Sequence, residues 1–228
     1  MIKIHQGNSL KLEPSDCNIV IDVIRAFTVA HYAFLNGAKR ILLVPTTDEA
    51  FSLKRKHPNF VLAGEEHGIG IQGFDFDNSP KRISKERLDN LTIVQKTTNG
   101  VQATLNSLNT KHLLVTGYSN AKSTASFVKK VIKGRSSTIN IIASHPTGDD
   151  DLACAEYIKA LILEQNIPAN IEIEKRIKQS HVCEKFYDPT NLLFNKADIA
   201  LCSREHPSNF VMKLVQDSEI PTIERFAL

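Results

Sequence analysis

Short apolar runs rich in β-branched residues alternate with longer amphipathic runs along most of this 228-residue chain. Runs such as NIVIDVI and INIIAS are apolar at nearly every position, which is typical of parallel strands buried on both faces. Strands that alternate with helices at this spacing predict an α/β fold, with a mostly parallel or mixed central sheet and helices on both faces. The expected strands are 18–24, 41–44, 60–63, 91–95, 112–116 and 138–143, and the expected helices are 26–36, 48–56, 100–107, 121–132 and 150–163.

The region from Ile167 to Leu228 is less regular. Its segment IEIEKRIK alternates like a strand but carries the charges of an exposed helix, so both interpretations stay open. NFVMKLVQ predicts a helix, and IPTIERF predicts a final edge strand. Because no repeat or linker divides the sequence, we expect one domain over residues 1–228.

Composition excludes several classes of protein. Hydrophobic residues make up 42% and charged residues 23%, which is ordinary globular usage and excludes a disordered chain. The net charge of +3 and the lack of a dense basic run argue against a nucleic-acid partner. The start, MIKIHQGNSLKLEPSD, has no signal-peptide core, and no apolar run approaches the ~20 residues that span a membrane. Four scattered cysteines without CxxC spacing suit a reducing cytosol, so we expect a cytoplasmic protein with no membrane partner.

Ligands of open α/β sheets bind beyond the carboxyl ends of the strands, so the polar residues that follow each strand are the candidates for a site on one rim. Asp22 stands out because it interrupts the apolar run IVIDVIRA, and a buried carboxylate is costly unless it is paired or bound to a metal. It could form a structural ion pair with Arg25, or it could be a metal ligand at the strand end. The planar guanidinium of Arg25 presents two parallel donors, which suits a phosphate or a sulfonate.

Two loops carry further candidates. The segment GIQGFDFDNSP reads as a structured loop that could present Asp75 and Asn78 to an ion, or that could simply satisfy these side chains in turns. The turn TTNG at 97–100 joins a strand to a helix, where free N–H groups favour an anion, although hydroxyl residues also cap many ordinary helices.

The acidic triplet at 149–151 opens an expected helix, where carboxylates suit the helix dipole. Close to Asp22 and Glu65, these carboxylates would build the oxygen-rich site that Mg²⁺ prefers. His67 and His145 fall in candidate site loops, whereas we interpret His31, His112 and His181 as structural or surface residues. The sequence contains no GxSxG elbow, which argues against a hydrolase of the serine-triad type.

Five blocks of the sequence together resemble the 2-phosphosulfolactate phosphatase (ComB-like) family: IDVIRAFTVAHYAFLNGAKRI, LAGEEHGIGIQGFDFDNSP, TTNGVQATL, GYSNA and the acidic segment before LACA. They occur in the family's order over roughly residues 19–160. The resemblance implies a Mg²⁺-dependent phosphatase that hydrolyses 2-phosphosulfolactate to sulfolactate and phosphate, a step toward coenzyme M. It implies catalytic roles for Asp22, Arg25, Glu65 and Asp75, substrate binding by Asn78, Ser79, Thr97, Thr98, Asn99, Gly100 and Asn120, and metal ligation by Asp22, Glu65, Asp150 and Asp151.

The chain departs from the family pattern at two positions. Glu66 and Gln102 stand where the family usually has arginine, which predicts the loss of two anion-binding cations. The alternative function is therefore a non-catalytic binder of a small phosphorylated or sulfonated acid. The acidic cluster opposes this alternative, because carboxylates without a metal do not help to bind an anion. A homodimer fits the base rates for soluble enzymes.

Overall fold

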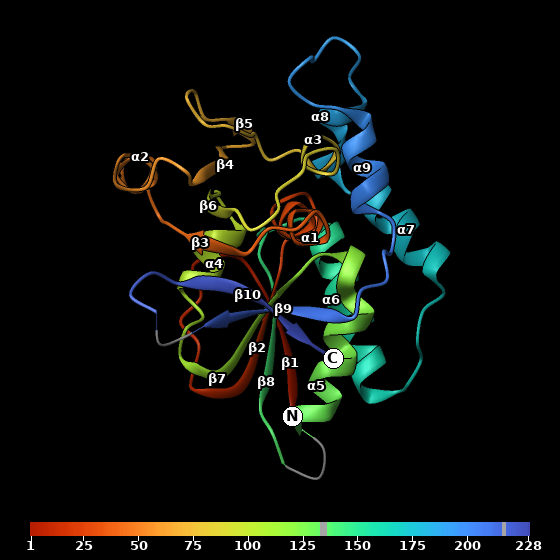
Figure 1. Cartoon of the computed structure of the whole chain (residues 1–228). Coiled ribbons are helices and arrows are strands. Elements are labelled where there is room, and N and C mark those ends of the chain that lie inside the picture. The colour runs from red at the N-terminus through yellow and green to blue at the C-terminus, as the bar shows by residue number, and fades with distance from the viewer. Residues whose placement is uncertain (133–135, 216–217) are drawn as a thin grey trace.

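The structure is a computed structural model that describes residues 1–132, 136–215 and 218–228. Its strands form one mixed ten-stranded sheet in the order β1-β8-β2-β7-β9-β10-β3-β6-β4-β5, with helices around it (Figure 1). The predicted α/β fold with a mixed sheet is therefore confirmed. The strands are β1 Ile2–Gln6, β2 Ser15–Ile21, β3 Arg40–Leu43, β4 Val61–Glu66, β5 Ile69–Gly70, β6 Thr92–Lys96, β7 Thr110–Thr116, β8 Ile139–Ala143, β9 Phe210–Val215 and β10 Thr222–Ala227.

The α-helices surround this sheet on both faces. They are α1 Ala26–Leu35, α2 Thr47–Lys56, α3 Pro80–Ile83, α4 Gly100–Leu105, α5 Ala121–Ile132, α6 Asp149–Leu163, α7 Asn170–Gln179, α8 Glu184–Tyr187 and α9 Lys196–Cys202. None of the helices in the described ranges is long and apolar enough to cross a membrane.

The sheet consists of two parallel blocks joined by an antiparallel pair. Strands β1, β8, β2 and β7 are parallel to their neighbours, and so are β3, β6 and β4. Between the blocks, β9 pairs antiparallel with β7, β10 with β9, and β3 with β10. Three successive antiparallel pairings reverse the direction of the chain, so the second block runs opposite to the first within the ladder.

Because the sheet is twisted, strand ends from both blocks can lie near each other at one end of the molecule. Neighbouring strands rotate by roughly 20–25° each, and this rotation accumulates across a wide sheet. In Figure 1 the strands β9 and β10 cross β2 and β8 at a steep angle. Strand ends from the two opposed blocks therefore converge near the start of α1, and residues at the carboxyl ends of β2, β4, β6 and β8 line one cavity there.

Alternating side chains of β2 fill two cores on opposite faces of the sheet. Val20 packs with α1, whereas Ile19 and Ile21 pack with α5, α6 and α7. The sequence of α1, AFTVAHYAFL, is apolar on all sides, so nearly the whole helix is buried. Each buried aliphatic side chain stabilises the fold by about 1.5–3 kcal/mol, which fixes α1 firmly beneath the converging strand ends.

The last third of the chain contains the main differences from the predicted elements. IEIEKRIK lies in helix α7, because Ile173 and Ile177, four residues apart, share one buried face. The predicted helix at NFVMKLVQ is wrong. Residues 210–215 form β9, in which Val211 faces one core and Met212 the other, and Gln216 lies outside the described residues.

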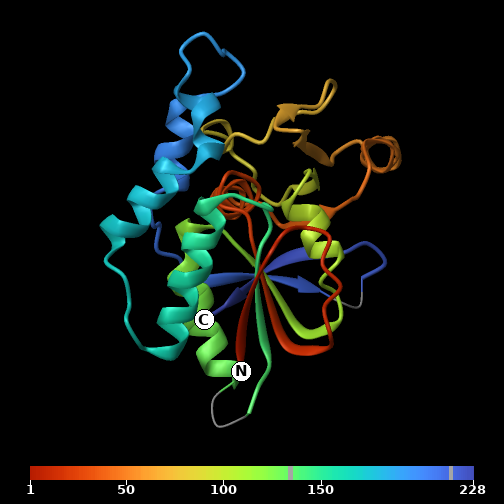
Figure 2. The ribbon, with the colours of Figure 1, turned by 180° about the vertical axis from the view of Figure 1, so that it is seen from behind.

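Two further strands differ in their place. The segment IPTIERF contains β10, which is a strand as predicted, but it lies inside the sheet between β9 and β3 and is not an edge. Strand β1 was not predicted, and it extends the sheet beyond β8. Figures 1 and 2 show that the chain after α6 runs back alongside α6 and brings α8 and α9 to the start of α1.

Candidate active site

A cavity of about 300 Å³ lies where the ends of β2, β4, β6 and β8 meet the start of α1. Its walls come from both parallel blocks and from the last third of the chain. The lining residues are Asp22, Ile24, Arg25, Glu65, His67, Gly68, Asn78, Thr98, Asn99, His145, Val182, Lys185 and Phe186. The structure thus brings together six of the predicted site residues, and also the two histidines that the sequence placed in candidate loops.

Asp22 is a buried carboxylate just beyond the end of β2, which starts and ends three residues earlier than predicted. Its Oδ1 accepts a hydrogen bond of 2.8 Å from the amide of Ala26 at the start of α1. Burial raises the pKa of Asp22 to about 7, and the negative charges of Glu65 and Asp150 act in the same direction. No ion pair between Asp22 and Arg25 is found within the described part of the chain, so this buried acid lacks a cationic partner there.

Gly100 permits helix α4 to approach Asp22. A Cβ atom at position 100 would lie 2.7 Å from Oδ2 and 3.0 Å from Cβ of Asp22. Both distances are too short for any side chain, so the glycine of the TTNG turn is required by packing against Asp22. Gly100 therefore allows α4 to pack against Asp22, and it does not itself line the cavity.

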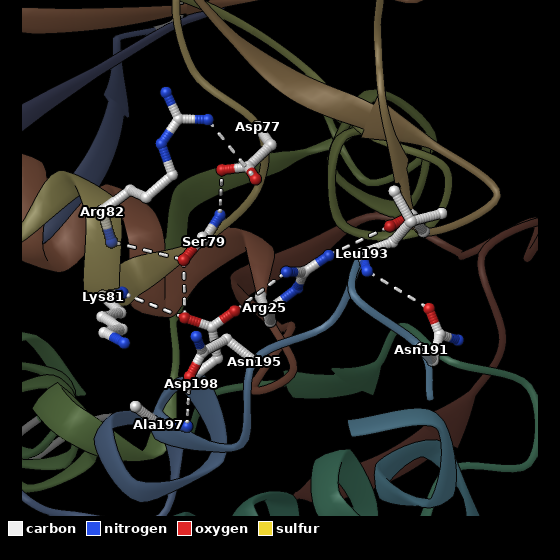
Figure 3. Close-up of polar contacts among 11 residues, drawn as sticks. Arg25, Asp77, Ser79, Lys81, Arg82, Asn191, Leu193, Asn195, Ala197 and Asp198 are labelled. Carbon is white, nitrogen blue, oxygen red and sulfur yellow. Dashed lines mark hydrogen bonds and ion pairs between the residues drawn. The ribbon is translucent and has the colours of Figure 1, made fainter. Parts of the chain in front are cut away.

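Arg25 is held in a fixed orientation by polar contacts, which Figure 3 shows, and by aromatic contacts. Its Nη1 donates to Asp198 at 3.0 Å, and its Nη2 donates to the carbonyl of Gly68 at 3.0 Å. The guanidinium also lies over the ring of Phe186, 5.0 Å from the centroid, and over that of Phe194 at 5.5 Å. Arg25 thus enters the cavity with part of its hydrogen-bonding capacity already used.

Asp198 connects this arginine to a second element. The buried carboxylate accepts hydrogen bonds from the hydroxyl of Ser79 at 2.6 Å and from the amide of Lys81 at 3.1 Å (Figure 3). Ser79 also caps helix α3, where its hydroxyl accepts from the amide of Arg82. The structure therefore places Ser79 behind Arg25 and outside the cavity lining.

Glu65 ties the end of β4 to the TTNG turn. Its carboxylate accepts hydrogen bonds from the amide and the hydroxyl of Thr98 and from the amide of Gly68. Next to it, Asn99 lines the cavity and accepts from the side chain of Asn8 at 2.8 Å. Thr97 is buried away from the cavity, and its hydroxyl accepts from the amide of Val101 in α4.

The acidic triplet lies behind the cavity. Asp150 accepts from the hydroxyl of Ser180 at 2.8 Å, and Asp151 accepts from the amides of Val23 at 2.7 Å and His145 at 2.9 Å. Burial raises the pKa of Asp150 to about 6, and burial together with the charge of Asp150 raises that of Asp151 well above its usual value. Both carboxylates are therefore close enough to affect Asp22 without lining the cavity.

The four carboxylates predicted as one magnesium site do not form a single ligand cluster. Among the described residues, no group of three or more His, Cys, Asp or Glu side chains is placed to hold a metal ion. Amide and hydroxyl donors hold Asp150 and Asp151, and neither carboxylate lines the cavity, whereas Asp22 and Glu65 do.

Two other predicted residues lie elsewhere. Asp75 is partly exposed and accepts from the amide of Leu62 at 2.7 Å and from Lys54 at 3.1 Å, outside the cavity. Asn120 is buried after β7, where its Oδ1 accepts from the amide of Gly117 at 3.1 Å. By contrast Asn78 lines the cavity, is buried, and has no hydrogen-bond partner for its Oδ1 within the described residues.

The two residues that depart from the family pattern, Glu66 and Gln102, lie outside the cavity lining. Glu66 is 59% exposed and forms an ion pair of 2.9 Å with the buried Lys96. Gln102 lies within α4, and neither side chain lines the cavity. The cavity is supplied with positive charge by Arg25 and Lys185, and the loss of two anion-binding cations at Glu66 and Gln102 stays a prediction.

Sequence reasoning missed the contribution of the last third of the chain. Val182, Lys185 and Phe186 line the cavity, and Asp198 orients Arg25. These residues have no motif spacing, and the signal that could have found them is slight: an isolated lysine beside aromatic residues in the irregular segment HVCEKFYD.

Comparison with known proteins gives the family. The sequence model of the 2-phosphosulpholactate phosphatase family matches residues 3–217. A Bacillus subtilis protein named "Probable 2-phosphosulfolactate phosphatase" is 58% identical over 224 residues, which cover 98% of each chain. The chain belongs to the 2-phosphosulfolactate phosphatase family.

More distant members of this phosphatase family show the same relationship. The chain is 35% identical to a Caldicellulosiruptor saccharolyticus protein over 77% of this chain and 74% of the other. It is 30% identical to a Clostridium perfringens (strain 13) protein over 90% and 88% of the two chains, and both proteins carry the same printed name. The family is one of phosphoric monoester hydrolases, and its match extends over the segment that supplies Lys185 and Asp198.

Proposed function

We propose that this chain hydrolyses 2-phosphosulfolactate to sulfolactate and phosphate. The observation that carries the proposal is the juxtaposition of Asp22 and Arg25 at the start of α1, inside a cavity of about 300 Å³. A fixed guanidinium and a helix N-terminus both favour an anionic ligand. The family match and the 58% identical relative name the corresponding phosphatase.

The oxygen atoms of the cavity suit Mg²⁺, and we infer that the protein uses this ion. Asp22 and Glu65 provide carboxylate oxygens, and the unpartnered Oδ1 of Asn78 is a carbonyl oxygen of the kind that hard cations bind. Asp150 and Asp151 would add negative charge behind these ligands. A bound Mg²⁺ supplies electrostatic stabilisation of the phosphoryl oxygens.

The side chains divide the remaining tasks. Arg25 donates hydrogen bonds to the phosphoryl group, and its orientation is held by Asp198 and by the carbonyl of Gly68. Thr98 and Asn99 face the same group from the turn before α4. A cavity carboxylate, Asp22 or Glu65, serves as general base toward water or as the attacking nucleophile.

Phosphate release from 2-phosphosulfolactate and from a panel of simple phosphate monoesters tests the proposal. Purified protein is expected to release phosphate with Mg²⁺, to stop in EDTA, and to recover in excess Mg²⁺. The alternative, a binder without turnover, depended on lost cations at Glu66 and Gln102, and these residues lie outside the cavity. Tight binding without turnover of any ester would nevertheless establish the binder. We place the reaction in the cytoplasm, on the route to coenzyme M.

A further inference from the structure

Lys185 lines the cavity, and its ammonium group has no ionic or hydrogen-bonding partner among the described residues. Lys185 lies in α8, is partly buried and lines the cavity next to Arg25. Within residues 1–132, 136–215 and 218–228 it forms no ion pair and no side-chain hydrogen bond. All three of its N–H donors are therefore free to meet a ligand.

Lys185 and Arg25 both lie close to the rings of Phe186 and Phe194. The Nζ of Lys185 lies 4.7 Å from the ring centroid of Phe194 and 5.9 Å from that of Phe186. The guanidinium of Arg25 lies over the same two rings, at 5.5 Å and 5.0 Å. Burial lowers the pKa of Lys185, as does repulsion from the nearby charge of Arg25, whereas the charges of Glu65 and Asp150 raise it. An anion beside them would remove this repulsion.

The loop between β4 and β5 passes so close to Lys185 that a side chain at Gly68 would collide with its ammonium group. Gly68 has a φ of +85°, and a Cβ atom there would lie 2.8 Å from Nζ of Lys185. The carbonyl of the same glycine accepts from Arg25. The loop between β4 and β5 is therefore shaped to pass close to both cations.

The two cations have different amounts of hydrogen-bonding capacity left. Arg25 is partly committed to Asp198 and Gly68, whereas Lys185 is free. The substrate of the proposed function carries a sulfonate and a carboxylate besides its phosphate. The carboxylates of Asp22 and Glu65, which line the cavity, repel these groups. A second cation would compensate one of the two anionic groups that remain on the product.

We propose that Lys185 binds this retained anionic group, the sulfonate or the carboxylate of the acid, while Arg25 binds the phosphoryl group. The inference rests on the proposed function for the identity of the substrate. It assigns substrate recognition to the last third of the chain.

Binding of two separate ligands tests the assignment without turnover. We expect Lys185→Gln to weaken the binding of sulfolactate by roughly 10–100-fold in calorimetry, because a charge-assisted hydrogen bond is lost. Binding of inorganic phosphate should change by less than about threefold, and Lys185→Arg should retain most of the affinity for sulfolactate. Equal loss for both ligands, or no loss for sulfolactate, would overturn the proposal.

Lys196→Gln is the matched control. Lys196 is exposed at the start of α9 and lies 5.9 Å from the ring centroid of Tyr187, so it is also a lysine near an aromatic ring. It does not line the cavity. Its substitution should leave sulfolactate binding unchanged, and circular dichroism should show both variants folded.

Kinetics with three esters identify the retained group. For Lys185→Gln we expect KM to rise strongly for 2-phosphosulfolactate and much less for phenyl phosphate, which has no second anion. A large rise for 2-phospholactate would assign Lys185 to the carboxylate, and a small one would assign it to the sulfonate. If the unaltered protein turns over none of these esters, the proposed function fails, while the sulfolactate titration still decides the role of Lys185.

Discussion

At the scale of single residues, the buried charges around the cavity differ in how they are compensated. Arg25 and Asp198 neutralise each other at 3.0 Å, with exposed fractions of 5% and 1%. Asp22, Asp150 and Asp151 are buried with raised pKa values, which indicates that they lack such compensation. The sequence could identify Asp22 because it interrupts an apolar run. It could not identify Asp198, whose partner is 173 positions away.

Asp22→Asn is expected to abolish Mg²⁺-dependent phosphate release. The amide keeps the size of the side chain and can still accept from Ala26, but it removes the negative charge that faces the cavity. We expect a loss of at least about 100-fold in kcat, the size typical of an electrostatic catalytic group. Asp75→Asn is the matched control, because Asp75 lies outside the cavity and pairs with Lys54. Release at the original rate from Asp22→Asn would refute our metal assignment.

Asp198→Asn should impair both stability and catalysis, because it leaves the buried guanidinium of Arg25 without its counter-charge. Breaking a buried ion pair from one side costs about 3–5 kcal/mol of the free energy of unfolding, measured by denaturation in urea. The positioning role predicts in addition a fall in kcat that Asp198→Glu partly restores. Ser79→Ala, which removes one hydrogen bond to Asp198 and the side-chain cap of α3, should cost about 2 kcal/mol. Unchanged kcat in folded Asp198→Asn would contradict the positioning role.

At the scale of elements, the sequence predicted correctly those strands and helices whose structure follows from the local pattern of apolar and polar residues. The buried strands β2, β6, β7 and β8 and the helices that follow them are visible as apolar runs and amphipathic periods. The strand β9 was misread because FVMKLV is buried on both faces, so it lacks the alternation that separates a strand from a helix. The position of β10 inside the sheet depends on its pairing with β3, which no local pattern encodes.

Helix α1 predicts a dependence of stability on pH. His31 is fully buried in this helix, with Nδ1 2.9 Å from the hydroxyl of Ser119, and burial with the nearby charge of His206 lowers its pKa to about 3. Between about pH 6.5 and 3 the unfolded chain binds a proton at this position and the folded chain does not. The contribution of His31 therefore makes the free energy of unfolding fall by up to roughly 1.4 kcal/mol per pH unit as the pH drops through this range.

A difference measurement isolates this contribution. Asp22 and Asp150 have raised pKa values and act in the opposite direction, so wild-type data alone combine both effects. The urea stability of wild type minus that of His31→Gln, measured at pH 7 and at pH 5, should be smaller at pH 5. An equal difference at both pH values would show that His31 is protonated alike in the folded and unfolded states.

At the scale of the whole molecule, the cavity is a product of long-range assembly. Strand ends from two opposed parallel blocks supply Asp22, Glu65, Thr98 and His145, and the last third of the chain supplies Lys185. The sequence indicated most of the polar candidates, because each follows a strand. It could not indicate which of them meet, since Asn120 also follows a strand and Asp75 lies in a candidate loop, yet both lie outside the cavity.

Ligand removal tests whether this assembly binds a cation. An ion that binds only the folded chain stabilises it by about 2.7 kcal/mol at 100 times its Kd. For a chain of this length that corresponds to a rise in Tm of roughly 5–10 °C. Mg²⁺ should raise the Tm of wild type and of Asp75→Asn, EDTA should reverse the effect, and Asp22→Asn should respond little. A similar rise in Tm for Asp22→Asn would place the ion elsewhere.

The pair β9–β10 has a consequence for how the chain matures. It joins the two halves of the sheet, yet it follows all the other described strands in chain order. Until synthesis reaches residue 227, β7 and β3 each present an unpaired backbone edge. Such edges promote the aggregation of nascent chains. Newly made protein should consequently depend on chaperones up to a late stage and gain its activity only after the closing hairpin has inserted.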